Sequence, residues 1–136
     1  GTDSGAGTSR LWTGEQLSGE IEENALIEFT SETQRDHLGR AVALGDINGD
    51  GHLDILLGAP RFATDASEQD EFHGALYLFL GSADIAGTWS SNQPVSEADV
   101  RWYSPEPFLR TGESFVTGDL DADGQAEVAL LLGARP

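Results

Sequence analysis

The apolar residues of this 136-residue chain fall into short runs that are separated by polar, glycine-rich segments. Two of the runs end at a glycine, Ile55–Leu57 before Gly58 and Val128–Leu132 before Gly133. Runs this short suit buried strands better than helices, which need about ten residues or more. A third apolar and aromatic run, Ala75–Gly81, also ends at a glycine and predicts another strand. The pattern therefore predicts an all-β chain.

Each of the first two runs follows an acidic nonapeptide, Asp46–Asp54 in one case and Asp119–Glu127, seventy-three positions later, in the other. Oxygen-bearing side chains stand at loop positions 1, 3, 5 and 9, and a glycine after position 5 lets the backbone turn sharply. Calcium suits this set because it takes six to eight oxygens in flexible geometry, whereas magnesium keeps more of its water and zinc prefers nitrogen or sulfur. We expect about two calcium ions per chain. The predicted ligands are Asp46, Asn48, Asp50, His52 and Asp54 in the first loop and Asp119, Asp121, Asp123, Gln125 and Glu127 in the second.

The residues after the loops separate these motifs from an EF-hand. An EF-hand loop has twelve residues, ends in a bidentate acidic side chain and joins two helices. Position 12 is Leu57 in one copy and Leu130 in the other, so each loop is expected to join two strands. His52, at position 7, is expected to present its backbone carbonyl to the ion. The alternative is a pair of acidic turns that bind nothing, since Asp, Asn and Gly are also ordinary turn residues.

The residues that flank the loops carry a family resemblance. Leu38-Gly39 precedes the first loop and Gly58-Ala59-Pro60 follows it, an arrangement that resembles an FG-GAP repeat, the unit of the integrin alpha-subunit β-propeller and of many secreted bacterial proteins. The second copy is looser, because Thr111-Gly112 replaces the first pair and Gly133-Ala134-Arg135-Pro136 carries an inserted arginine. The resemblance implies a calcium-stabilised β-propeller module of a secreted or cell-surface protein of the bacterial type, used for recognition, adhesion or assembly.

Taken as a repeat, the strands form two four-stranded antiparallel blades that are offset by half a blade. Arg10–Gly14 corresponds to Leu78–Gly81, and Leu26–Phe29 corresponds to Val100–Tyr103 at a spacing of 74. With each acidic loop between the first and second strands of a blade, the chain reads third, fourth, first, second, third, fourth, first, second. The expected parts of this single unit are a half blade over 1–36, a full blade over 37–104 and a half blade over 105–136.

Two blades make an incomplete propeller, since a closed one needs about four to eight. A repeat unit also cannot bury its apolar face without neighbours. Either the chain is a fragment of a longer propeller, or several copies join head to tail. In the second case the first and second strands of one copy complete a blade with the third and fourth strands of the next.

The charge balance narrows the range of partners. The formal net charge is −17, and all seven basic residues are arginines. Such a field repels nucleic acid and anionic membrane surfaces, and no apolar stretch is long enough for membrane insertion. Another protein, a glycan surface or further copies of the chain are the expected partners. The acidity also fits general solubility or a salty medium, because only seven of the 24 acidic residues lie in the two loops.

Catalysis has little support, and the chain is predicted not to be an enzyme. The three histidines, His37, His52 and His73, lack a zinc-like spacing, and no nucleophile motif is present. An accessory or lectin-like module of a secreted enzyme is the alternative function. The acidic cluster within 65–71 is either a solvated loop or a further cation or partner site. Its members are Asp65, Glu68, Asp70 and Glu71.

The three tryptophans invite a comparison with carbohydrate-binding surfaces. Trp12 and Trp102 lie within strand patterns and are expected to pack between blades. Trp89 lies in a Gly-Thr-Trp-Ser-Ser loop and is the tryptophan expected to be available for ligand binding.

Overall fold

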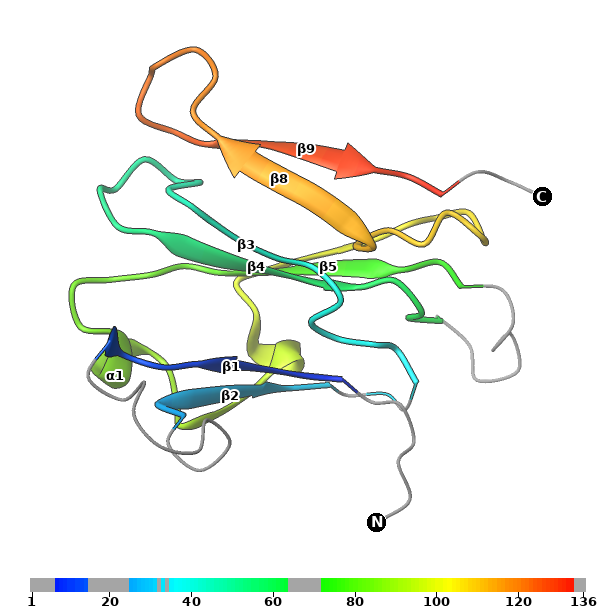
Figure 1. Cartoon of the computed structure of the whole chain (residues 1–136), viewed down its shortest axis with the longest axis horizontal. Coiled ribbons are helices and arrows are strands. Elements are labelled where there is room, and N and C mark those ends of the chain that lie inside the picture. The colour runs from blue at the N-terminus through cyan, green and yellow to red at the C-terminus, as the bar shows by residue number, and fades with distance from the viewer. Residues whose placement is uncertain (1–6, 15–24, 32, 34, 64–71, 134–136) are drawn as a thin grey trace.

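Three β-sheets lie in layers one above the other (Figure 1). The computed structural model describes residues 7–14, 25–31, 33, 35–63 and 72–133. Within these residues, no helix has the length and apolar character needed to cross a membrane. The middle sheet has the order β3 (Val42–Gly45), β4 (Asp54–Ala59), β5 (Ala75–Phe79) and β7 (Val100–Tyr103). The lower sheet contains β1 (Thr8–Leu11), β2 (Ile27–Thr30) and β6 (Asn92–Pro94), and the upper sheet contains β8 (Ser114–Gly118) and β9 (Glu127–Leu131).

The middle sheet confirms the predicted all-β fold and the predicted order of strands in a blade. Its neighbours β3–β4, β4–β5 and β5–β7 are all antiparallel, and the first acidic loop joins β3 to β4. Successive side chains of a strand point to opposite faces of the sheet. Ile55 and Leu57 therefore pack with the lower sheet, whereas Leu56 packs with the upper one. Because both faces of β4 are covered, its sequence after Asp54 is continuously apolar rather than alternating.

Two apolar cores hold the layers together. The lower core is aromatic: the ring centroids of Phe29 and Phe79 lie 4.8 Å apart, and Trp89 meets Phe29 edge-on at 5.7 Å. The upper core is smaller and is built from Leu56, Leu76, Leu78 and Phe115. Each sheet thus buries a face against its neighbour, which is how blades of a propeller pack.

The observed register corrects the spacing predicted for the fourth strands. When Gly14 is aligned with Gly81, Leu11 corresponds to Leu78. Leu11 lies opposite Ile27 in the lower sheet, and Leu78 lies opposite Val100 in the middle sheet. Ile27 therefore corresponds to Val100 at a spacing of 73, not 74. A slip of one residue would turn every side chain to the other face of the sheet. The corrected spacing equals that of the two acidic loops, so the loops and the fourth strands share one period, whereas β1 and the glycine after β9 do not.

Three short elements were not predicted. A short helix, α1 (Ile85–Thr88), begins after Asp84, whose carboxylate accepts the Gly87 N–H. Strand β6 then pairs in parallel with β2, so a segment between the third and fourth strands of the middle blade extends the lower sheet. A single helical turn after β6, Val95–Glu97, returns the chain to β7 and buries Val95.

The residues that flank the first acidic loop join its two ends. Gly39 N–H donates to the carbonyl of Gly58 at 2.8 Å, and Gly58 N–H donates to the carbonyl of Ala41 at 2.9 Å. Gly58 also packs directly on the backbone of Gly112, which has a φ of +94° and leaves no room for a side chain. Backbone hydrogen bonds therefore connect the segment before the first loop, at Gly39, to the segment after it, at Gly58. Gly58 in turn contacts Gly112 of the next repeat.

A buried carboxylate shapes the turn before β3. Asp36 is 1% exposed, and its carboxylate accepts hydrogen bonds from the Ser31 hydroxyl, the Thr33 hydroxyl at 3.3 Å and the Leu38 N–H at 3.1 Å. Burial raises the pKa of Asp36, and these hydrogen bonds offset only part of the rise. No local pattern in the sequence indicates this network, because the burial of Asp36 depends on the packing of the turn.

Candidate metal centre

The loop between β3 and β4 is organised by its own polar side chains. Asp46 Oδ1 accepts the Asp50 N–H at 3.1 Å, and Asp46 Oδ2 accepts the Gly51 N–H at 2.8 Å. Asn48 Oδ1 accepts the Asp50 N–H at 3.2 Å, and Asp50 Oδ1 accepts the His52 N–H at 2.9 Å. The side chains at positions 1, 3 and 5 are therefore held in place by the backbone of the loop itself.

The loop between β8 and β9 repeats this pattern position by position. Asp119 Oδ1 accepts the Asp123 N–H at 3.1 Å, and Asp119 Oδ2 accepts the Gly124 N–H at 3.0 Å. Asp121 Oδ1 accepts the Asp123 N–H at 3.2 Å, and Asp123 Oδ1 accepts the Gln125 N–H at 2.8 Å. The two loops thus share a backbone conformation although only three of their nine residues are the same.

The carboxylate at position 9 closes each loop. Asp54 Oδ2 accepts the Ile47 N–H at 2.8 Å, and Glu127 Oε2 accepts the equivalent Leu120 N–H at 2.7 Å. Asp54 is completely buried, and its second oxygen accepts the Gly81 N–H at 2.8 Å. The longer glutamate reaches the same partner as the aspartate, so the difference in residue type at position 9 leaves the closure intact.

Positions 4 and 6 of both loops have positive φ. In the first loop these are glycines, Gly49 at +74° and Gly51 at +87°. In the second loop position 6 is Gly124 at +91°, but position 4 is Ala122 at +62°. An L-residue other than glycine pays a steric cost in this region, so the second loop carries strain that the first one avoids.

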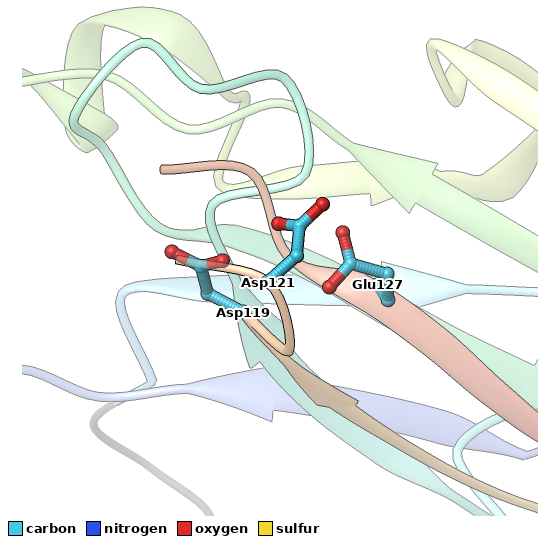
Figure 2. A group of neighbouring side chains, drawn as sticks. All are labelled: Asp119, Asp121 and Glu127. Carbon is cyan, nitrogen blue, oxygen red and sulfur yellow. The ribbon is translucent and has the colours of Figure 1, made fainter. Parts of the chain in front are cut away.

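Three carboxylates of the second loop gather on one side of the chain (Figure 2). Oxygen atoms of Asp119, Asp121 and Glu127 all lie within 4.8 Å of one another. Calcium binds oxygen at about 2.3–2.6 Å, so two ligands on opposite sides of the ion are about 5 Å apart. An all-oxygen set with this spread fits calcium, and each carboxylate oxygen that accepts an N–H still has a lone pair for a cation.

The first loop has a lower charge than the second. Asn48 replaces one carboxylate, and its Nδ2 donates to Asp50 Oδ2 at 3.1 Å. The His52 N–H, followed by this Asn48 donor, lowers the pKa of Asp50. Asp50 therefore stays ionised, and an ionised carboxylate can bind a cation.

The two loops contact each other at the same end of the sheets (Figure 1). Ala126 N–H donates to the backbone carbonyl of Asp46 at 2.7 Å. Gly49 approaches the side chain of Gln125 so closely that an added Cβ would lie 2.7 Å from its Cγ. Strands β3 and β8 adjoin beneath the loops, where the Thr117 hydroxyl donates to the carbonyl of Leu44. The two loops are thus in direct contact, although seventy-three residues separate them in the sequence.

The expectation for Trp89 is wrong. Its indole is only 6% exposed and packs edge-on against Phe29 and Phe79 in the lower core. The sequence reads as a polar loop at this position, but the loop folds back so that its aromatic ring fills the space between two sheets. Trp102 behaves differently: it is 43% exposed and lines a groove between the middle and upper sheets.

The other candidate site residues from the sequence do not belong to the two loops. The acidic cluster within 65–71 lies outside the described residues. His73 is buried, and its Nδ1 lies 3.0 Å from the carbonyl oxygen of Ser104, which assigns it to packing between β5 and the end of β7.

Two acidic residues near the first loop were not anticipated. Glu97 and Asp99 line a groove of ≈ 450 Å³ together with Asn48, Asp50 and Trp89. The Asp99 carboxylate accepts the Leu80 N–H at 2.8 Å, and the Glu97 carboxylate accepts from Gln93 Nε2 at 2.8 Å. About fifty residues of chain separate them from the loop, so only the fold brings them there.

The strand order, the face-to-face sheets and the acidic loop between first and second strands define the class of the protein: it is built from β-propeller blades. Comparison with known families agrees with this class. Residues 38–79 match the model of the FG-GAP repeat. The chain belongs to the FG-GAP, integrin alpha-like β-propeller proteins.

Several curated relatives are similar over most of the chain. Integrin alpha-3 of Cricetulus griseus is 28% identical over 116 residues, which are 85% of this chain and 10% of that protein. Human integrin alpha-7 is 32% identical over 92 residues, which are 68% of this chain and 7% of that protein. Phosphatidylinositol-glycan-specific phospholipase D of Bos taurus is 28% identical over 141 residues, which are 95% of this chain and 16% of that protein. The chain therefore spans a small part of each relative's length.

Proposed function

We propose that this chain is a calcium-stabilised, non-enzymatic β-propeller module that serves extracellular recognition, adhesion or assembly. One observation carries the proposal: the two loops hold their acidic side chains by the same hydrogen bonds, with three carboxylates of the second loop within 4.8 Å of one another. Ordinary acidic turns have no reason to repeat this arrangement position by position.

The stabilising effect follows from electrostatics. Without a cation, the carboxylates within each loop repel one another, most strongly in the second loop where three of them gather, and a divalent ion turns this repulsion into attraction. The ion also joins the first strand of a blade to the second, because positions 1 and 9 lie at the ends of those strands. Stabilisation is roughly 1 to 3 kcal/mol per site when calcium is about ten- to hundredfold above its dissociation constant.

The expected calcium affinity indicates where the proposed module would work. Sites in extracellular modules bind calcium with dissociation constants of about 0.1 to 1 mM, and they fill where calcium is about millimolar. The similarity to integrin alpha chains supports a place at or outside the cell surface and a protein or glycan surface as partner.

Calorimetric melting with calcium and with a chelator tests the metal sites. We expect calcium to raise the midpoint of the wild-type protein. Glu127→Gln keeps an oxygen for the Leu120 N–H but removes one ligand charge, so it should lose about half of the rise. Glu113→Gln is the matched control, because it removes the same charge from a residue just before β8 and outside both loops. A midpoint that does not respond to calcium in the wild type would contradict the proposal.

A second function has its own support. The similarity to phosphatidylinositol-glycan-specific phospholipase D covers 95% of this chain, which favours an accessory module of a secreted enzyme. Reading the complete open reading frame separates the two functions. A catalytic domain in the same frame would support the accessory module, whereas further repeats or an adhesion domain would support the first proposal.

A further inference from the structure

A groove of ≈ 450 Å³ lies between the first acidic loop and the segment that joins β5 to β7. Asn48 and Asp50 line it from the loop, and Glu97 and Asp99 line it from the segment. Both sides belong to the middle blade, so the groove is formed by one continuous part of the chain, away from the first and last strands. Its volume is in the range of about 300–1,000 Å³ that is typical of ligand sites.

Buried side chains hold the segment that forms one side of this groove. Gln93 is only 5% exposed, its Oε1 accepts the Ser90 N–H at 2.9 Å, and its Nε2 donates to Glu97 Oε2 at 2.8 Å. Asp99 Oδ2 accepts the Leu80 N–H at 2.8 Å. Each carboxylate is thus held by one oxygen, and its other oxygen remains available to a ligand. The acidic side of the groove is therefore organised before a ligand binds.

The indole N–H of Trp89 is a second feature of the groove that points to a ligand. Trp89 is only 6% exposed, and its N–H has no hydrogen-bond partner among the described residues. This N–H is not one of the described side-chain atoms that are sealed from solvent without a partner, so it reaches the groove that Trp89 lines. The N–H of a buried tryptophan usually finds a hydrogen-bond partner. A ligand in the groove is therefore expected to offer an acceptor to Trp89.

The charge of the groove favours a cationic ligand. Three carboxylates, those of Asp50, Glu97 and Asp99, line it, and its described lining contains no arginine. These three do not gather within 4.8 Å of one another, as the three carboxylates of the second loop do. Their spacing therefore suits an extended organic cation better than a single metal ion. A guanidinium group, with five N–H donors in a planar fork, can meet separated carboxylates.

We propose that the groove binds a basic peptide segment of a partner protein, with an arginine side chain between the carboxylates and a backbone carbonyl on the Trp89 N–H. The inference names the partner chemistry of the recognition module and so rests on the proposed function. A peptide supplies the cation and the acceptor within one residue. A neutral glycan supplies no cation, and it cannot stack on Trp89, whose ring packs against Phe29 and Phe79.

A titration followed by nuclear magnetic resonance tests the groove directly. The probe is the peptide acetyl-Gly-Arg-Gly-amide, and the same peptide with citrulline in place of arginine keeps the shape without the charge. The arginine peptide should shift the indole N–H signal of Trp89. The signal of Trp102, which lines a different groove between the middle and upper sheets, should not move. The citrulline peptide should bind roughly tenfold more weakly.

Two results of this titration would overturn the proposal. One is a Trp89 signal that does not move at millimolar concentrations of the arginine peptide. The other is equal binding of the arginine and citrulline peptides, because the carboxylates would then contribute nothing. Glucose serves as a neutral sugar in a parallel titration, and a shift with glucose but not with the arginine peptide would assign the groove to a glycan instead.

Single charge removals separate the groove from the general field of the protein. Glu97→Gln and Asp99→Asn each keep an oxygen for their partners, Gln93 and the Leu80 N–H, and each should weaken peptide binding roughly threefold to tenfold. Glu113→Gln removes the same charge just before β8, at the end of that strand opposite to the second acidic loop. It should weaken binding by less than about twofold. Equal losses in all three variants would overturn the proposal, because net charge alone would then attract the peptide.

The same titrations in calcium and in chelator keep this inference separate from the metal sites. Glu97 and Asp99 lie outside both acidic loops, so the peptide should bind in both conditions. Peptide binding without a calcium-dependent rise in the melting midpoint would support the groove and contradict the metal sites. A calcium-dependent rise without peptide binding in either condition would overturn the groove and leave the metal sites standing.

Discussion

The difference between Gly49 and Ala122 at loop position 4 leads to two substitutions with opposite expected effects. Both residues have positive φ, +74° and +62° respectively. Ala122 is exposed, so Ala122→Gly removes no packing and relieves the steric cost of the left-handed region. Gly49→Ala introduces that cost and places a Cβ 2.7 Å from Gln125 Cγ. The first substitution should stabilise the protein and the second should destabilise it.

The magnitudes follow from two opposing effects. A non-glycine residue pays about 1–2 kcal/mol in the left-handed region, whereas glycine in place of alanine costs about 0.4–1 kcal/mol through greater freedom of the unfolded chain. Ala122→Gly should therefore raise the free energy of unfolding by about 0.5–1 kcal/mol. Gly49→Ala should lower it by about 0.5–1.5 kcal/mol, including the displacement of a flexible glutamine side chain.

Urea denaturation in excess chelator measures both changes without any contribution from bound metal. The fluorescence of buried Trp89 reports unfolding, and an unchanged dependence on urea would show that the unfolded states are comparable. Effects of the same sign for the two substitutions would refute the reasoning, as would a loss of stability in Ala122→Gly. Repeating the series in calcium then shows whether the relieved strain also tightens the second loop around the ion.

Three further substitutions test the packing and the buried carboxylate. Leu56→Ala removes a fully buried side chain from the upper core and should cost about 2–5 kcal/mol in chemical denaturation. Trp89→Ala should cost about 3–5 kcal/mol by the same measurement, whereas a ligand-binding surface residue would cost little. Burial raises the pKa of the Asp36 carboxyl, so the folded protein retains a proton that the unfolded chain has released, and the contribution of Asp36 to stability falls as pH rises through that window. Asp36→Asn lacks this titration, so the unfolding free energy of the wild type minus that of the variant should increase from about pH 7 to about pH 4.

The strands and loops were predictable because their signals are local. Short apolar runs that end at glycine identify β4 and β9, and the acidic nonapeptides lie between first and second strands as expected. The loop conformation is also local. The carboxylates at positions 1 and 9 of each loop accept hydrogen bonds from backbone N–H groups that are five or seven residues away in the sequence.

Other features depend on contacts between distant residues. Trp89 lies in a segment of small polar residues, and its burial arises from Phe29 and Phe79, which the sequence does not connect to it. The predicted spacing of the fourth strands was one residue too long for a similar reason. Leu26 and Ile27 are both apolar, and only the buried face of the strand shows which of them corresponds to Val100. Strand β6 is made of Asn92, Gln93 and Pro94, and no strand propensity marks it.

The hydrogen bond from the Ala126 N–H to the carbonyl of Asp46 makes the two loops thermodynamically dependent on each other. In the proposed function, a cation that restrained Asp46 in the first loop would also restrain Ala126 at position 8 of the second loop. Linkage is reciprocal, so any effect of one occupied site on the affinity of the other would be the same factor in both directions. If both loops bind calcium as proposed, this backbone contact would make neighbouring blades respond to the ion together rather than site by site.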